Sequence, residues 1–147
     1  MYKNILIATD GSPLSRKAVH DGLALARVMG AQVVALNVVP RYPVAYFEGG
    51  STVSNEEVAR IEKQWADAAQ ALVDKVKLEA EAQGVSVKAI TAHSDLVAES
   101  IIAAAQKHGS DLIVMASHGR RGLKRLLLGS ETINVLTHSH IPVLVLR

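Results

Sequence analysis

The chain of 147 residues contains no cysteine. This absence excludes a disulfide framework, a thiol nucleophile and a cysteine-ligated zinc site. Aromatic residues make up only 3% of the sequence, which argues against the stacking platforms that bind single-stranded nucleic acid. We therefore expect no nucleic-acid partner, although the chain is mildly basic, with a net charge of +2.

Long apolar runs are also missing. No uninterrupted apolar segment approaches the roughly 20 residues that span a bilayer, so we expect no membrane partner. The opening residues, MYKNILIATD, lack the charged region, the long apolar region and the cleavage site of a signal peptide. We therefore expect a cytoplasmic protein. The length and the 49% hydrophobic content predict a single globular domain over residues 1–147.

Common phosphate-binding motifs are absent as well. The glycine-punctuated segment MASHGRRGLKRLLLGSET matches neither the Walker motif nor the Rossmann motif Gly-x-Gly-x-x-Gly. On its residues alone, this segment is open to interpretation as a phosphate-binding loop, a basic patch or a connection. Its cationic residues are Arg120, Arg121, Lys124 and Arg125.

Short apolar runs predict β-strands at residues 4–9, 32–39, 85–91, 111–116 and 141–146. Most of these runs are nearly continuously apolar, as expected for parallel strands that are buried on both faces. The run VSVKAIT alternates instead, because Ser86 and Lys88 face away from its apolar residues. This alternation predicts a half-solvated edge of the sheet.

Helical patterns fill the gaps between these runs. Ser12 and Pro13 predict the start of the first helix, as N-cap and first helical residue. Ser54 and Glu57 form a capping box for the second helix, and Asp95 is the predicted cap of the third. The predicted helices span residues 15–29, 54–83, 96–108 and 130–137. The predicted buried stripe of the second helix is Val58, Ile61, Trp65, Ala68, Leu72 and Val76.

The regular alternation of strand and helix predicts an α/β fold. We expect a doubly wound, five-stranded parallel sheet with helices on both faces and strand order 3-2-1-4-5, which is flavodoxin-like or Rossmann-like. In such sheets the ligand crevice lies beyond the carboxyl ends of the strands, where the strand order reverses. Here the reversal brings together TDGSP (9–13) and the start of the glycine-punctuated segment. The long irregular stretch 40–54 predicts a lid, a binding loop or a mobile segment.

The residues of these loops suit an anion. Gly119 and Gly129 allow backbone N–H groups to approach a phosphate closely. Ser130 is a good N-cap at the start of the last predicted helix, where free amides and the helix dipole favour phosphate. Asp10 offers a carboxylate to ribose hydroxyls or to magnesium held between phosphates. Val38, at the end of the second strand, offers an apolar wall to a purine.

With these residues in view, the sequence resembles the universal stress protein family over essentially its whole length. The resemblance rests on ILIATDGS, DLIVMASHG and LLLGSETINVLTHSHIPVLVL. The ATP-binding branch of this family carries Gly, two residues, Gly, nine residues and then Gly-Ser or Gly-Thr. Gly119 and Gly129-Ser130 match this pattern, whereas Ala116 replaces the first glycine.

The resemblance implies an ATP site, with magnesium bound through the phosphates beside Asp10. It implies a phosphate cradle at Gly119, Gly129 and Ser130. The full set of nucleotide-binding residues that it implies is Ala8, Thr9, Asp10, Val38, Met115, Ala116, Gly119, Arg120, Gly129, Ser130 and Glu131.

The last predicted strand suggests self-association. As the outermost strand it would expose an apolar edge, and such edges aggregate unless they are covered or paired. Pairing with its own copy about a twofold axis solves this problem, so we predict a homodimer through Ile141–Leu146. The resemblance implies the same arrangement.

Our leading hypothesis is an ATP-binding stress or regulatory protein that acts as a dimer with an unidentified protein partner. No general base and no activated nucleophile is evident, so we name no catalytic residue and expect hydrolysis to be absent or slow. The first alternative is a nucleotide-independent interaction module, which Ala116 favours. The second alternative is a nucleotide hydrolase.

Overall fold

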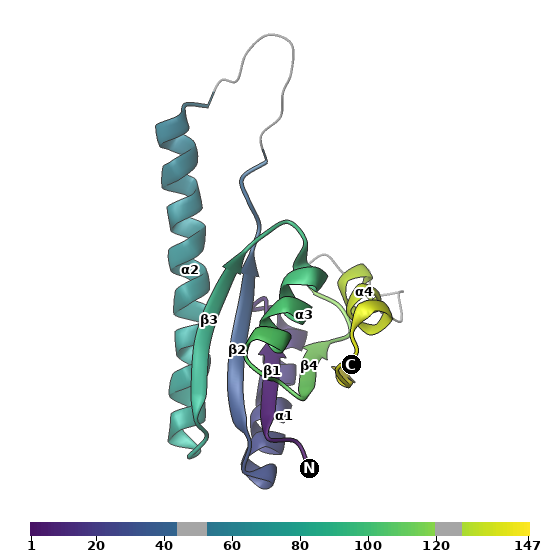
Figure 1. Cartoon of the computed structure of the whole chain (residues 1–147). Helices are drawn as coiled ribbons and strands as arrows, with labels where there is room; N and C mark the ends of the chain where they lie inside the picture. Colours follow the sequence, from purple (N-terminus) through teal and green to yellow (C-terminus); the bar gives the residue numbers. More distant parts are fainter. Residues whose placement is uncertain (44–52, 120–127) are drawn as a thin grey trace.

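The computed structural model describes residues 1–43, 53–119 and 128–147 (Figure 1). The described strands form one parallel sheet in the order β3-β2-β1-β4-β5, which confirms the predicted fold class and strand order. The elements, in chain order, are β1 (Asn4–Ala8), α1 (Pro13–Met29), β2 (Gln32–Val39), α2 (Asn55–Ala82), β3 (Val87–His93), α3 (Val97–Lys107), β4 (Leu112–Ala116), α4 (Ser130–His138) and β5 (Val143–Leu146).

Helices cover both faces of the sheet. Alternate residues of β1 divide between two cores, because successive side chains of a strand point to opposite faces. Ile5 and Ile7 pack with α1 and α2, whereas Leu6 packs with α3 and α4. Figure 1 shows α3 and α4 in front of the sheet and α1 behind it. All three residues are fully buried, so β1 lies at the centre of the molecule.

The first helix begins as predicted. The Oγ atom of Ser12 accepts a hydrogen bond from the backbone N of Ser15 at 3.2 Å, and Pro13 is the first helical residue. Ser54 likewise accepts from the backbone N of Glu57 at 3.2 Å at the start of α2. Both contacts satisfy N–H groups that have no partner within the helix.

Two other predicted N-caps are wrong, although the helices begin within one residue of the predicted positions. The residue before α3 is Leu96, and the carboxylate of Asp95 instead accepts a hydrogen bond from the backbone N of Arg41 at 2.9 Å. The Oγ atom of Ser94 accepts from the backbone N of Leu96 at 3.0 Å. At α4 the N-cap is Gly129, and Ser130 is the first helical residue.

The predicted stripe of α2 is only partly correct. Ala68 is exposed, and Val58 and Trp65 are half-buried. Figure 1 shows the reason: the N-terminal half of α2 extends beyond the sheet, so only its C-terminal half packs on the strands. The residues of α2 that are buried are Ala69, Val73, Val76 and Ala80.

The two edge strands also differ slightly from the predicted ranges. β3 begins at Val87 rather than at residue 85, and Ser86 and Lys88 are exposed, as predicted for an edge. β5 begins at Val143 rather than at residue 141, and it forms the opposite edge, as predicted. Most of the predicted irregular stretch 40–54 lies outside the described residues. Among the described residues, no helix is long and apolar enough to cross a membrane.

Gly22 lets α1 pack closely against the sheet. A Cβ atom placed there would lie 2.8 Å from Ile7 Cδ1 and 3.3 Å from Val114 Cγ1. We predict that Gly22→Leu lowers the free energy of unfolding by about 1–3 kcal/mol or more, because it overpacks this contact. Urea denaturation followed by circular dichroism measures the change. Ala24→Leu is the control, since Ala24 is exposed on the same helix. Equal unfolding midpoints for the two variants would contradict the tight packing.

Candidate functional site

The turn after β1 is held by its own polar side chains. The Oδ1 atom of Asp10 accepts a hydrogen bond from the backbone N of Ser12 at 2.9 Å. The Oγ1 atom of Thr9 lies 3.1 Å from the Oγ of Ser15 and accepts from the backbone N of Gly11 at 3.3 Å. Gly11 has a φ of 79°, a conformation that favours glycine. The turn therefore holds the Asp10 carboxylate in one orientation at the carboxyl end of β1.

Gly119 meets that carboxylate across the point where the strand order reverses. A Cβ atom placed on Gly119 would lie only 2.5 Å from Asp10 Oδ2. Gly119 is not among the glycines with positive φ, so the close approach rather than the backbone conformation requires glycine here. The structure thus brings together two predicted site residues that are far apart in the sequence.

The start of α4 is tied to the end of β4. The backbone N of Gly129 donates to the carbonyl oxygen of Ser117 at 2.6 Å. A Cβ atom on Gly129 would lie 3.2 Å from His118 Cα, so this position also requires a small residue. The buried Thr132 hydroxyl lies 3.0 Å from the carbonyl oxygen of Ala116 and 3.1 Å from that of Ser117. These contacts place the first turn of α4, including the exposed Ser130, directly beside the end of β4.

Ala8, Val38 and Met115 share one face of the sheet. All three pack with the core cluster formed by α3 and α4. Their strands, β2, β1 and β4, are neighbours in the sheet, so these side chains line an apolar strip near its carboxyl edge. Val38 is the predicted wall for a purine base, and the predicted site residues Ala8 and Met115 lie on the same face.

Ala116 lies on the other face, since the alternating residues Leu112 and Val114 pack with α1 and α2. Its side chain is buried. No described non-glycine residue has a positive φ, so Ala116 adopts an ordinary strand conformation. Its methyl group therefore causes no backbone strain in the motif.

Glu131 has a structural contact that the sequence did not predict. Its Oε2 atom accepts a hydrogen bond from the backbone N of Ala98, in the first turn of α3, at 3.3 Å. A residue of α4 thus supplies an N-terminal partner for α3. The proposed nucleotide contact of Glu131 stays a prediction. Arg120 lies outside the described residues.

Sequence reasoning also missed Asn37. Its Nδ2 atom donates to the carbonyl oxygen of Thr9 at 2.6 Å and so joins the ends of β2 and β1 next to Asp10. The available signal was an amide side chain inside the apolar run QVVALNVV. Thr132 carried no such signal, because a threonine in the first turn of a helix is common.

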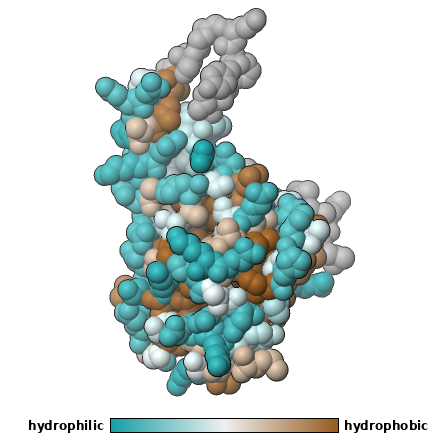
Figure 2. Space-filling view, viewed as in Figure 1, coloured by the Kyte–Doolittle hydropathy of each residue, from teal (hydrophilic) through white to brown (hydrophobic). Residues whose placement is uncertain are grey.

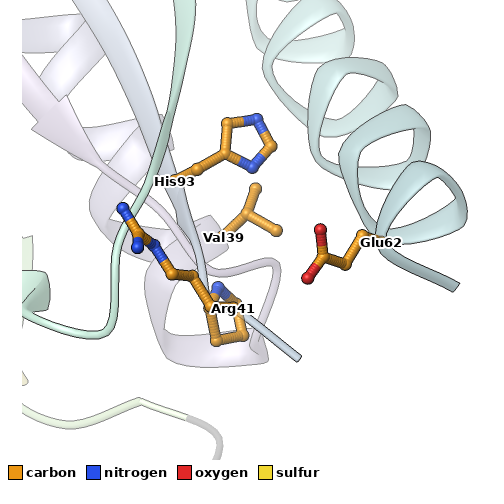
Figure 3. Close-up of a pocket in the computed structure, with 5 residues that line it drawn as sticks. Val39, Arg41, Glu62 and His93 are labelled. Atoms are coloured by element: carbon orange, nitrogen blue, oxygen red, sulfur yellow. The ribbon is translucent and has the colours of Figure 1, made fainter. Parts of the chain in front are cut away.

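A hollow of about 310 Å³ lies away from this site, at the ends of β2 and β3. Figure 3 shows the side chains of His93 and Glu62 on either side of Val39, with the Arg41 guanidinium directed away from Glu62. Next to it, the rings of Tyr42 and Trp65 stack with their centroids 6.0 Å apart. This hollow lies between α2 and the ends of β2 and β3, and none of the predicted site residues lines it.

The described side chains of the site do not form a metal-binding centre by themselves. Among the described residues, no group of three or more histidine, cysteine, aspartate or glutamate side chains is arranged to hold a metal ion. Magnesium would therefore need phosphate oxygens in addition to Asp10. Elsewhere, burial together with Lys88 and Lys107 lowers the pKa of His108. His108 lies at the C-terminal end of α3, the end opposite the site.

Comparisons with known proteins identify relatives over the whole chain. The universal stress protein family model matches residues 1–147. Universal stress protein MJ0531 from Methanocaldococcus jannaschii is 36% identical, over 100% of this chain and 83% of its own length. Universal stress protein MJ0577 from the same organism is 31% identical, over 100% of this chain and 96% of its own length. The solved structure of MJ0577 has a TM-score of 0.83 and covers 99% of this chain and 96% of that chain.

A more distant solved structure carries a nucleotide. It is a universal stress protein family member from Arabidopsis thaliana with AMP bound, 16% identical, with a TM-score of 0.67. It covers 97% of this chain and 90% of that chain. At this level of identity the likeness shows the fold alone. The family model and the archaeal relatives, in contrast, cover the whole chain, and the chain therefore belongs to the universal stress protein family.

Proposed function

We propose that this chain is a cytoplasmic regulatory protein that binds ATP with magnesium at the reversal of the strand order and acts as a homodimer. The observation that carries the proposal is the meeting of Asp10, Gly119 and the first turn of α4 at one edge of the sheet. These groups come from three separate segments, and each suits a different part of a nucleotide.

The phosphates would lie at the start of α4. Free amides and the helix dipole at a helix N-terminus attract anions. Ser130, the first residue of α4, is exposed there and adds a hydroxyl donor. Close contacts exclude a Cβ atom at Gly119 and at Gly129, so these two positions offer backbone alone to a ligand. The nearby Glu131 carboxylate is bonded to the first turn of α3, which suits a site for anions.

The ribose and the base would lie beside β1. The Asp10 carboxylate is oriented by Ser12 and would accept hydrogen bonds from ribose hydroxyls or bind magnesium together with the phosphates. Ala8, Val38 and Met115 would contact the purine through apolar surface. The AMP-bound relative supports an adenine nucleotide, and the glycine pattern of the sequence supports ATP.

We propose that hydrolysis is absent or slow. The Asp10 carboxylate accepts a backbone hydrogen bond and lies against Gly119, which suits a ligand better than a general base. The hydroxyl of Ser117 lies 3.2 Å from His118 Nδ1, but Ser117 is buried and so is not placed for attack on a ligand. The nucleotide would instead favour one conformation or one complex, which requires different affinities for the two states.

Isothermal titration with Mg-ATP tests the site. We predict that Asp10→Asn weakens binding about 10- to 100-fold, because a charge-assisted hydrogen bond contributes about 1.5–3 kcal/mol. The amide oxygen can still accept the bond from Ser12, so the turn should remain folded. Asp67→Asn is the control, since Asp67 is exposed on α2. Wild-type protein that shows no binding at millimolar Mg-ATP would refute the proposal.

The second candidate function is a nucleotide-independent interaction module. The observation in its favour is the alanine at position 116, where the ATP-binding branch has glycine. Because Ala116 is buried and unstrained, we predict that Ala116→Gly changes the affinity for Mg-ATP by less than about threefold, or under 1 kcal/mol. Affinity that appears only in the variant would favour the interaction module. Steady-state phosphate release by the wild type above about 1 per second would instead favour a hydrolase.

The dimer would form through the free edge of β5. The carbonyl oxygens of Pro142 and Leu146 accept hydrogen bonds from β4, so the alternate residues Val143 and Val145 direct their backbone groups away from it. Leu144 is 39% exposed on this strand. An apolar strand with unpaired backbone groups is a template for pairing with a second copy.

We predict that Val145→Pro converts the dimer to a monomer without unfolding it. The substitution removes an outward N–H group, and proline is tolerated where an edge strand faces solvent. Light scattering after size exclusion measures the mass. Ala89→Pro is the matched control on the opposite edge strand, β3. The carbonyl oxygen of Ser86 accepts a hydrogen bond from β2, so the backbone N–H group of residue 89 points away from β2. A wild-type monomer, or equal dissociation of both variants, would argue against the β5 interface.

A further inference from the structure

A larger hollow of about 460 Å³ lies between α3 and α4. Its lining includes the apolar residues Leu96, Ile102 and Ala103. Leu96 is 58% exposed and belongs to neither core cluster, so its apolar surface is not used by the fold. Figure 2 shows brown side chains on this face of the molecule, bordered by teal ones. We refer to this feature as the α3–α4 groove.

The charge of the α3–α4 groove is opposite in sign to that of the chain. The sequence has 16 lysine and arginine residues against 14 aspartate and glutamate residues. The described residues that line the groove nevertheless include Asp95, Glu99 and Glu131, together with His138, and no lysine or arginine. All three carboxylates lie at the N-terminal ends of α3 and α4, so one end of the groove is acidic.

Two of these carboxylates are held in place by backbone hydrogen bonds. Asp95 and Glu131 accept hydrogen bonds from the backbone N–H groups of Arg41 and Ala98, which carry no net charge. In the part of the chain that the structure describes, ion pairs join only residues of α2 to one another. None of the three carboxylates therefore forms an ion pair with a described residue.

We propose that the α3–α4 groove docks a cationic, amphipathic segment of a partner protein. Apolar side chains of that segment would lie over Leu96 and Ile102, and its lysine or arginine residues would face the acidic end. Amphipathic helices bind grooves in this way, and complementary charge selects the partner and accelerates association. This proposal does not require a bound nucleotide, and Glu131 belongs both to the groove and to the predicted nucleotide site.

Charge also argues against a second copy as the occupant. A twofold dimer places the same patch of both subunits in contact, so the patch must be complementary to itself. The described lining of the groove carries three carboxylates and no lysine or arginine, so it does not meet that condition electrostatically. The occupant must instead supply the positive charge that the groove lacks.

Fluorescence anisotropy with a synthetic peptide tests the proposal. The probe is a fluorescein-labelled amphipathic peptide of leucine and lysine at helical spacing, and the reference peptide has glutamate in place of lysine. We expect saturable binding of the lysine peptide only. Leu96→Ala should weaken it about tenfold through lost apolar contact, and Glu99→Gln about threefold through lost charge.

Matched variants on α2, which covers the other face of the sheet, distinguish docking in the groove from non-specific attraction of the peptide to the protein surface. Leu78→Ala and Glu79→Gln remove an exposed leucine and an exposed carboxylate from α2, and they should leave the affinity unchanged. Ala103→Arg adds a cation to the groove at an exposed helical position and should also weaken binding. Circular dichroism of every variant verifies that the fold is intact.

Several results would overturn the proposal. Absence of saturable binding, equal binding of the glutamate peptide, or equal losses in the groove and control variants would each do so. Light scattering provides a further check. If the Leu96→Ala variant has a different molar mass in solution from the wild type, the groove would be assigned to a second copy of this chain instead.

Discussion

The first strand is hydrogen-bonded on both sides, to β2 and to β4, and the remaining elements are arranged around that pairing. Burial of β1 on both faces requires helices in front of the sheet and behind it. The strand that follows β1 in the chain, β2, lies on one side of it, and β4 lies on its other side. The segments that follow β1 and β4 therefore leave neighbouring strands at the same edge of the sheet. Asp10 and Gly119 meet there, so the candidate site follows from the topology.

That edge also collects the N-termini of the helices, since the helices run antiparallel to the strands. Side chains supply partners to several of these ends. Ser12 caps α1, and Glu131, from α4, accepts a hydrogen bond from the first turn of α3. The start of α4 has glycine as its N-cap and therefore no side-chain cap. Among these ends, α4 is the one best suited to receive an external anion.

Local patterns were sufficient to predict most of the fold. Apolar runs identified the strands, and Ser12 with Pro13 identified the start of α1, because these signals act over a few residues. The errors arose where distant segments meet. Asp95 bonds to Arg41, 54 positions away, and Asn37 and Thr132 bond to backbone groups of other elements. The meeting of Asp10 with Gly119 followed from strand order, whereas the burial of Ala116 required the structure.

Because α2 extends beyond the sheet, its two halves are stabilised by different contacts. From Ala69 onward it is anchored to the core. Before that point its stability rests on local terms, such as the Ser54 cap and the Lys63–Asp67 pair, and on the stacking of Trp65 with Tyr42. Local terms of this kind are weak, so backbone amides in the N-terminal half should exchange with solvent sooner than those near Val73. The core therefore depends on the C-terminal half of α2, and the N-terminal half contributes little to it.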